Sequence, residues 1–288
     1  MASTDAGREV PLRALGERDL PGCLRLSAAA RWNQNEADWR LMLQIGRGWG
    51  IVLADGTLAA STLVLPYDGF AWISMVLVLP EHRKQGLATR LLRTALSSLE
   101  QEGKVPVLDA TPAGRAVYLR EGFADAWGFK RYRLSAPAEG LRRRHESVRP
   151  LQARDWGRLL EIDRAAFGGS REPLLRALAE RLPGAALVAE RRGAIAGYIF
   201  GRDGREAQQL GPLVAEDSAA AKALLESALA GASLPVYADI ADHTPTLLAW
   251  LEALGFAYQR PFTRMVRGAG AAPGDARRVF LVAGPELG

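Results

Sequence analysis

The stretch that decides the fold is AWISMVLVLPEHRKQGLATRLLRTALSSL, residues 71–99. Its first part is an unbroken apolar run, which is typical of a strand buried on both faces of a sheet. After Pro80 and a short charged turn that contains Gly86, leucine and alanine recur at helical spacing. At such a strand–turn–helix joint, the first turn of the helix has unpaired N–H groups and the positive end of the helix dipole. Together with Arg83 and Lys84, these features predict a site for a phosphate or diphosphate.

Composition limits the classes of function. The chain has 288 residues, enough for two ordinary domains. Its net charge of +5 is modest, so we expect a small anionic ligand rather than nucleic acid. One cysteine, Cys23, and three scattered histidines predict neither an internal disulfide nor a metal centre. Because we find no secretory signal and no apolar run long enough for a membrane span, we expect a cytoplasmic protein that does not act at a membrane.

The sequence repeats itself in order. Three pairs of segments match at a nearly constant offset: LRALGERD (12–19) with VRPLQARD (148–155), LADGTLAAS (53–61) with AERRGAIAGY (189–198), and VLDATPAGRAVYLREGF (107–123) with IADHTPTLLAWLEALGF (240–256). The last pair shares Asp, Thr-Pro and Gly-Phe at the same spacing. Three ordered matches predict two copies of one fold, arranged head to tail.

The segment between the copies is rich in small residues, Pro, Gly and Arg, which predicts a linker at 137–147. We therefore expect an N-terminal domain at 1–136 and a C-terminal domain at 148–288. Each copy reads as strand, helix, helix, antiparallel strands, the strand–turn–helix described above, then strand, helix and strand. This order predicts an α/β architecture, a mixed sheet with helices on both faces.

Two motifs of the first copy carry a resemblance to a known family. VLPEHRKQGLATRLL resembles the acetyl-CoA-binding motif of the GCN5-related N-acetyltransferase (GNAT) superfamily, Gln/Arg-x-x-Gly-x-Gly/Ala, filled here by Arg83, Gly86 and Ala88. AVYLREGF resembles the family's later motif, with Tyr118 four residues before Gly-Phe. The second copy resembles the divergent C-terminal GNAT-like domain of some bacterial tandem proteins. The resemblance implies two tandem GNAT-like domains and transfer of an acetyl group from acetyl-CoA, without a metal, to an amine. We expect a small-molecule acceptor and a monomer or homodimer.

The resemblance also implies roles for particular residues. The backbone of Val76, Leu77 and Val78 would pair with the pantetheine arm of acetyl-CoA like an added strand. The joint would hold the pyrophosphate through Arg83, Lys84, Gln85, Gly86, Leu87, Ala88 and Thr89. Tyr118 would protonate the leaving thiolate as general acid.

The general base is less clear from the sequence. Family members often use a Glu on the central strand, whereas this strand offers only Ser74 and Met75. Three carboxylates remain as alternatives, Glu36, Asp68 and Asp109, and we select Glu36. The residues that we expect to bind the acceptor are Trp32, Asn33 and Asp68.

The second copy departs from the first at the cofactor motif. We align the two copies by matching Leu224-Leu225 of the second with Leu91-Leu92 of the first. In this alignment, Glu216 replaces Arg83, Asp217 replaces Lys84, Ala219 replaces Gly86 and Leu251 replaces Tyr118. Two cations thus become anions, and the proton donor is lost. We expect the second copy to bind acetyl-CoA poorly or not at all. A non-catalytic CoA- or ligand-binding sensor remains the alternative to an enzyme, because the sequence does not identify the base.

Overall fold

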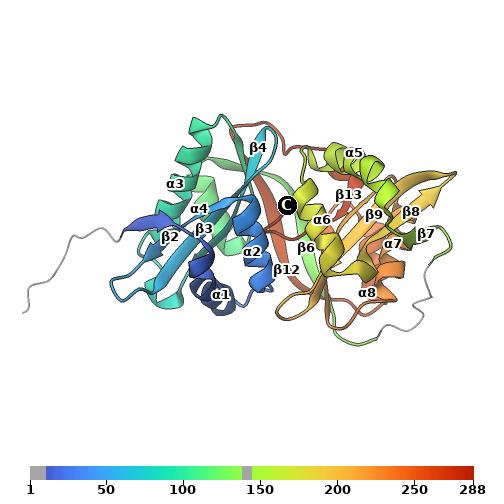
Figure 1. Ribbon diagram of the computed structural model, residues 1–288, viewed down its shortest axis with the longest axis horizontal. Coiled ribbons are helices and arrows are strands. Elements are labelled where there is room, and N and C mark those ends of the chain that lie inside the picture. The colour runs from blue at the N-terminus through green and yellow to red at the C-terminus, as the bar shows by residue number, and fades with distance from the viewer. Residues whose placement is uncertain (1–10, 138–144) are drawn as a thin grey trace, which may run out of the picture.

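The computed structural model describes residues 11–137, here called the first half, and residues 145–288, the second half (Figure 1). Most of the predicted linker, residues 138–144, lies outside the described residues. The elements of the first half are β1 (Leu12–Ala14), α1 (Leu20–Ala29), α2 (Glu36–Ile45), β2 (Arg47–Val52), β3 (Leu58–Pro66), β4 (Phe70–Val78), α3 (Leu87–Gln101), β5 (Val105–Ala110), α4 (Pro112–Arg120) and β6 (Phe123–Leu134).

The second half has the same order of elements and one further strand at its end. Its elements are β7 (Val148–Pro150), α5 (Trp156–Phe167), α6 (Glu172–Arg181), β8 (Leu187–Arg191), β9 (Ala194–Arg202), β10 (Gln208–Ala215), α7 (Ser218–Leu229), β11 (Val236–Ala241), α8 (Pro245–Ala253), β12 (Ala257–Arg267) and β13 (Val279–Leu281). This repetition confirms the prediction of two copies of one mixed α/β fold.

The matched segments at the start of each half make the same local contact. Arg13 donates two hydrogen bonds to Asp19, at 2.9 and 2.6 Å. In the second half Arg149 does the same to Asp155, at 2.6 and 2.9 Å. In each half the arginine lowers the pKa of its aspartate. The shared Arg and Asp of the repeat therefore fasten the first strand of each half to the turn before its first helix.

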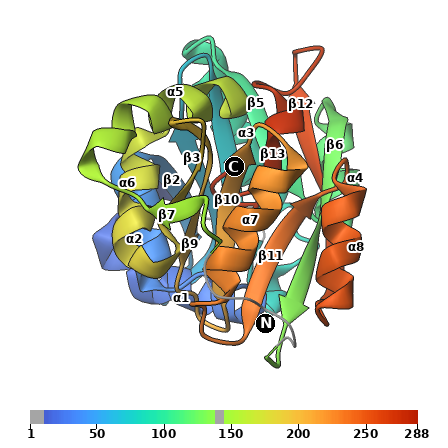
Figure 2. The same ribbon diagram turned by 90° about the vertical axis from the view of Figure 1, so that its right-hand side faces the viewer.

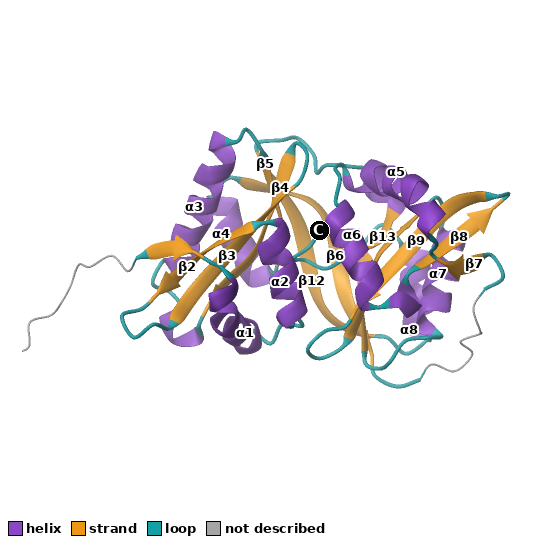
Figure 3. Cartoon of the chain, viewed as in Figure 1, coloured by secondary structure: helices purple, strands orange, loops and turns teal. Residues whose placement is uncertain are grey.

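All described strands form one sheet of 13, in the order β1-β2-β3-β4-β5-β12-β6-β11-β13-β10-β9-β8-β7. It is mixed, because β4 pairs with β5 and β10 with β11 in parallel, whereas the other pairs are antiparallel. Two strands are exchanged. β12 of the second half pairs with β5 of the first, and β6 of the first half pairs with β11 of the second. The predicted domains 1–136 and 148–288 thus trade a strand in space, and the sheet runs unbroken between the lobes in Figure 3.

Two buried ion pairs hold the exchanged strands. Arg264 of β12 donates twice to Asp109 of β5, both at 3.0 Å. Arg131 of β6 donates twice to Asp239 of β11, at 2.7 and 2.6 Å. A buried charge without a partner is costly, so each pair fixes which strand lies beside which. In each pair, an arginine of an exchanged strand lies directly opposite an aspartate of the neighbouring strand.

Helices cover both faces of the sheet. One apolar core contains side chains of α1, α2, α5 and α6, so it extends from one half to the other. A second apolar core lies under α3, and a third lies under α7 and α8. Helices α7 and α8 lie side by side in Figure 2. The predicted apolar run forms β4, whose side chains are buried from residue 70 to 75. Among residues 11–137 and 145–288, no helix has the length and apolar character needed to cross a membrane.

Candidate active site

The centre of the first half is a gap between β4 and β5. The two strands pair only where Phe70–Trp72 lie beside Val105–Val107, and β4 then bulges against β3. At the bulge Met75 has a φ of 51°, a conformation that non-glycine residues adopt rarely. The hydroxyl of Ser61 donates to the Met75 carbonyl at 2.8 Å and supports this conformation. The bulge turns the end of β4 away from β5.

The free edge of β4 faces this gap. Leu79 N–H donates to the carbonyl of Ala59 on β3 at 2.9 Å. Backbone groups of a strand alternate between its two edges, so Leu77 faces β3, whereas Val76 and Val78 face the gap. Of the three residues expected to pair with a pantetheine arm, Val76 and Val78 therefore face the open edge, where the Val78 carbonyl already accepts a hydrogen bond from Arg83 Nε at 3.2 Å.

Helix α3 begins beside the gap with an open N-terminus. Its N-cap, Gly86, has a φ of 78°, and a Cβ atom there would meet nothing within 4 Å. Within the described residues no side chain caps the helix, and its first backbone bond runs from Arg90 to Gly86. The N–H groups of residues 87–89 are thus free to donate hydrogen bonds to a ligand. Arg83 and Lys84 are exposed next to them, which suits an anion such as a diphosphate.

The second half fills the same gap with its own chain. β10 and β11 also pair over only three residues, Gln208–Leu210 with Val236–Ala238. β13 then lies between them, with Leu281 paired to Leu213 of β10 and to Ile240 of β11. The contact is close: a Cβ on Gly211 would lie 2.1 Å from the Val282 carbonyl oxygen. β13 therefore occupies the position that is open in the first half.

The helix after β10 is closed as well. Asp217, the N-cap of α7, accepts a hydrogen bond from Ala220 N–H at 2.9 Å. This bond and the Arg191 guanidinium lower the pKa of the Asp217 carboxyl. The side chain thus supplies at α7 the negative charge that a ligand would supply at α3.

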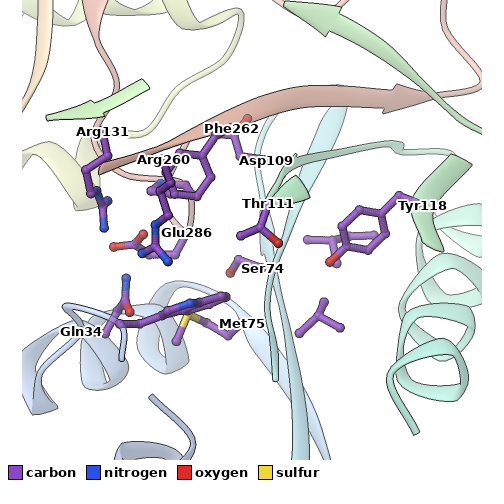
Figure 4. A pocket seen from close by; sticks show the side chains of 14 residues that line it. Gln34, Ser74, Met75, Asp109, Thr111, Tyr118, Arg131, Arg260, Phe262 and Glu286 are labelled. Atoms are coloured by element: carbon purple, nitrogen blue, oxygen red, sulfur yellow. The ribbon is translucent and has the colours of Figure 1, made fainter. Parts of the chain in front are cut away.

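A pocket opens from the gap in the first half toward the second half (Figure 4). Its lining comes from both: Trp32, Gln34, Ile73, Ser74, Met75, Val76, Asp109, Thr111, Tyr118, Arg131, Arg260, Phe262, Pro285 and Glu286. Tyr118 lies at one end and Arg131 at the other in the figure. The pocket therefore connects the predicted reaction centre to a surface built by the exchanged strands.

Tyr118 is held on α4 by local contacts. The hydroxyl of Thr111 caps this helix by accepting from Gly114 N–H at 3.2 Å. The Tyr118 ring packs edge-on against Phe123, with centroids 5.9 Å apart. Burial raises the pKa of the Tyr118 hydroxyl to about 12. It therefore stays protonated at neutral pH and can donate a proton.

Two carboxylates line the pocket. Asp109 is engaged by Arg264, and burial raises the pKa of its carboxyl against the effect of that arginine. Glu286 pairs through Oε1 with Arg202, whereas its buried Oε2 has no hydrogen-bond partner among the described residues. Of the two, Glu286 has the oxygen that is free to bind a ligand.

Glu286 is held in place by the segment around it. Trp72 of β4 donates to the Pro285 carbonyl at 3.0 Å, and the Tyr67 hydroxyl donates to the Leu287 carbonyl at 3.0 Å. Arg202 also lies 2.5 Å from Asp38 of α2. Contacts from both halves thus fix the position of this carboxylate.

The other predicted residues lie elsewhere. Glu36 is exposed and accepts from Arg40 at 2.8 Å, outside the pocket lining. Asn33 is buried and spans the halves: its amide donates to the Ala207 carbonyl at 3.0 Å and accepts from two backbone N–H groups. Asp68 accepts from Ser170 N–H at 3.2 Å and forms an ion pair with Arg164. Asn33 and Asp68 thus join the halves, and Trp32 alone of the three lines the pocket.

Sequence reasoning missed the pocket residues that come from the exchanged strands and the second half. These are Arg131, Arg260, Phe262, Pro285 and Glu286. None belongs to a motif of the first half. One signal was present: Phe129 and Arg131 recur as Phe262 and Arg264 at the offset of the third repeat.

Comparisons with known proteins agree with this geometry. A model described as Acetyltransferase (GNAT) family matches residues 19–123, and one described as Acetyltransferase (GNAT) domain matches residues 159–281. The chain therefore belongs to the GNAT family and carries two GNAT domains in tandem. The predicted resemblance is confirmed, and the family supports an acetyltransferase activity.

Several relatives and solved structures match over most of their length. The chain is 25% identical to the uncharacterized N-acetyltransferase YitH of Bacillus subtilis (strain 168), over 84% of this chain and 86% of the relative. It shares the fold of a "Putative Acetyltransferase" from Pyrococcus horikoshii, with a TM-score of 0.81, 20% identity and coverage of 100% and 99% of the two chains. A tandem GNAT protein from the clavulanic acid biosynthesis pathway aligns over 89% of this chain and 98% of its own, with a TM-score of 0.60 and 15% identity.

Proposed function

We propose that the protein transfers an acetyl group from acetyl-CoA to the amino group of a small molecule, and that the first half carries the reaction. One observation carries this proposal. The gap between β4 and β5 is open and ends at an uncapped helix beside two cations, whereas β13 and Asp217 fill the equivalent positions of the second half. Only the first half has both an edge for a pantetheine arm and N–H groups for a diphosphate.

The chain's own residues divide the binding of the donor. The backbone of Val76 and Val78 pairs with the amide groups of the pantetheine arm as a neighbouring strand would. The N–H groups at the start of α3 bind the pyrophosphate, with Arg83 and Lys84 adding charge. Gly86 leaves room for the phosphates, because no side chain extends over the helix end.

The protons then balance as follows. Acetyl-CoA supplies the acetyl thioester, whose C–S bond breaks as a C–N bond to the amine forms. A protonated amine gives up two protons in becoming an amide, and the leaving thiolate takes up one. We assign Glu286 as the acceptor of the first proton of the ammonium group, which then passes to solvent, since its Oε2 lacks a partner. Tyr118 donates its proton to the thiolate, and the second proton of the amine restores the Tyr118 hydroxyl. Glu36, the residue selected from the sequence, is engaged by Arg40 outside the pocket.

A titration followed by an activity assay tests this proposal. Calorimetry with acetyl-CoA should give one site per chain, and free thiol should appear in the presence of small amines at a rate above acetyl-CoA hydrolysis. Two sites, or none, would contradict the assignment to the first half. Binding of one acetyl-CoA without thiol release across a broad amine panel would favour the sensor.

A further inference from the structure

Arg260 lines the pocket and forms no ion pair with any described residue. It is half-buried on β12, with its guanidinium 5.3 Å from the centre of the Phe262 ring. No carboxylate of the described residues lies within ion-pair distance of it. Its neighbours differ, because Arg131 and Arg264 each donate two hydrogen bonds to a buried aspartate. Two arginines at the exchanged strands are thus neutralised, and the third faces the pocket.

The surroundings of Arg260 favour a bound anion. Burial and the nearby Arg131 lower the pKa of its guanidinium, so the charged form is disfavoured when the pocket is empty. An anion in the pocket would remove this cost and could accept two parallel N–H bonds from the planar fork. Glu286 lies close enough to reduce the positive potential, which suits a single negative charge better than two.

Other atoms of the pocket lining are unpaired hydrogen-bond acceptors. Three buried oxygens of the pocket lining have no partner among residues 11–137 and 145–288: Gln34 Oε1, Ser74 Oγ and Glu286 Oε2. These side chains are 2%, 6% and 2% exposed. Buried polar atoms are rarely left unpaired, so a ligand with several N–H groups would satisfy them. An ammonium group is the simplest such ligand, and it must approach Ser74 to reach the bulge of β4.

We propose that the acceptor is an amino-acid-like molecule, in which an amine and a carboxylate belong to one small ligand. The carboxylate pairs with Arg260, and the amine lies among Gln34, Glu286 and Ser74. This inference rests on the proposed function and adds the class of acceptor. It also gives the second half a role, because Arg260 and Glu286 both come from it.

Matched acceptors test this inference. The panel contains amino acids, their carboxamides, the amines that lack the carboxyl group, and the aminophosphonic acids, each with acetyl-CoA and the full chain. We expect kcat/KM for the carboxylate to exceed that for the carboxamide by about 10- to 100-fold, the range for a charged hydrogen bond. Arg260→Gln should reduce this ratio to near one, mainly by raising KM, and Arg260→Lys should retain part of it.

Arg267→Gln is the matched control, because Arg267 lies on the same strand and does not line the pocket. It should keep the wild-type ratio. The affinity of Arg260→Gln for acetyl-CoA shows whether that variant is folded. A wild-type enzyme that acetylates amines with no preference for the carboxylate overturns the inference alone, as does an unchanged ratio in Arg260→Gln. If the enzyme prefers the aminophosphonic acid to the amino acid, the proposal that the acceptor carries a carboxylate is wrong. A wild-type chain that does not bind acetyl-CoA overturns the proposed function itself.

Discussion

The two halves of this molecule have the same fold, but the gap between the central parallel strands is open in the first half and filled in the second. In each, the central parallel strands separate after three paired residues, and a helix begins just beyond. In the first half, the gap between β4 and β5 is open and helix α3 has no side-chain cap. In the second half, β13 lies in the equivalent gap and Asp217 caps α7. A duplicated domain can therefore lose a ligand site through contacts that also stabilise the domain. A strand in the gap adds backbone hydrogen bonds and a capped helix satisfies its N–H groups, and both favour folding.

The second half contributes to the pocket in another way. The strand exchange brings Arg260 and Phe262 against the first half, and the segment at residues 282–288 adds Glu286. The closed half thus forms a wall of the pocket that the open half begins. If the proposed function holds, donor and acceptor are bound by different halves, and substitutions in each should affect different kinetic constants.

The largest effect is expected from closing the open half. Gly86→Trp places an indole over the N–H groups that start α3, and we expect the affinity for acetyl-CoA to fall by about 100-fold or more as several charged hydrogen bonds are lost. Calorimetry measures the affinity. Gly103→Trp is the control, because Gly103 also has a positive φ, with open space around it, at the far end of the same helix. Equal losses in both variants would mean that backbone strain, rather than the site, is responsible.

Removing the proton donor should reduce turnover next. Tyr118→Phe keeps the ring against Phe123 and removes the hydroxyl, so we expect kcat to fall by about 100-fold with little change in acetyl-CoA affinity. Tyr258→Phe, at an exposed tyrosine outside the pocket, should behave as wild type. An unchanged kcat in Tyr118→Phe would leave this ring a packing role only.

The pH profile gives a second measure of the same residue. Because its pKa is raised to about 12, the hydroxyl remains protonated throughout the accessible alkaline range. The kcat/KM of the wild type should therefore rise toward the pKa of the acceptor amine and show no decline up to about pH 10. A decline that begins near pH 9 would assign the proton donor to another group.

Copying the charges of the second half into the first should have a smaller effect. The double variant Arg83→Glu with Lys84→Asp places anions beside the diphosphate site, and we expect about tenfold weaker acetyl-CoA binding at low salt. The difference should shrink as salt rises, because both side chains are exposed. Arg25→Glu with Arg154→Asp changes the net charge equally at exposed positions away from the site and should bind normally. Similar weakening in both would indicate an effect of net charge.

Much of this comparison could be predicted from the sequence, because local patterns carry it. The apolar run, Gly86 and the cations specify the strand, the turn and the helix start. The change from Lys84 to Asp217 predicts weak acetyl-CoA binding by the second copy, whereas the insertion of β13 was not predicted. Such features depend on neighbours within a few residues, so spacing and residue type are sufficient to find them.

The strand exchange could not be predicted in this way. Whether β6 pairs within its own half or with β11 depends on Arg131 finding Asp239 more than 100 residues away, and no local pattern encodes that choice. The predicted base, Glu36, lies outside the pocket because of where helix α2 begins. Helix α2 begins at Glu36, so Gln34 stays in the extended segment that lines the pocket, whereas Glu36 faces solvent beside Arg40.

The smallest effect is expected from removing the side-chain cap of α7 in the second half. Asp217→Ala removes the cap of α7 and should lower the free energy of unfolding by about 1 kcal/mol, measured by urea denaturation. Acetyl-CoA should still bind to one site per chain, because β13 continues to fill the gap between β10 and β11. A second bound acetyl-CoA in this variant would show that the cap, rather than the strand, closes the second half.

The pH dependence of that difference identifies its source. The Asp217 pKa is lowered by the bond from Ala220 and by Arg191, so the ionised carboxyl contributes stability above the pKa of an unfolded aspartate, about 4. As pH falls through the lower folded pKa, this contribution is lost, and the stabilities of wild type and Asp217→Ala should converge. Conversely, a gap that persists in acid would mean that the side chain stabilises α7 through packing. The capping charge would then not be what distinguishes α7 from α3.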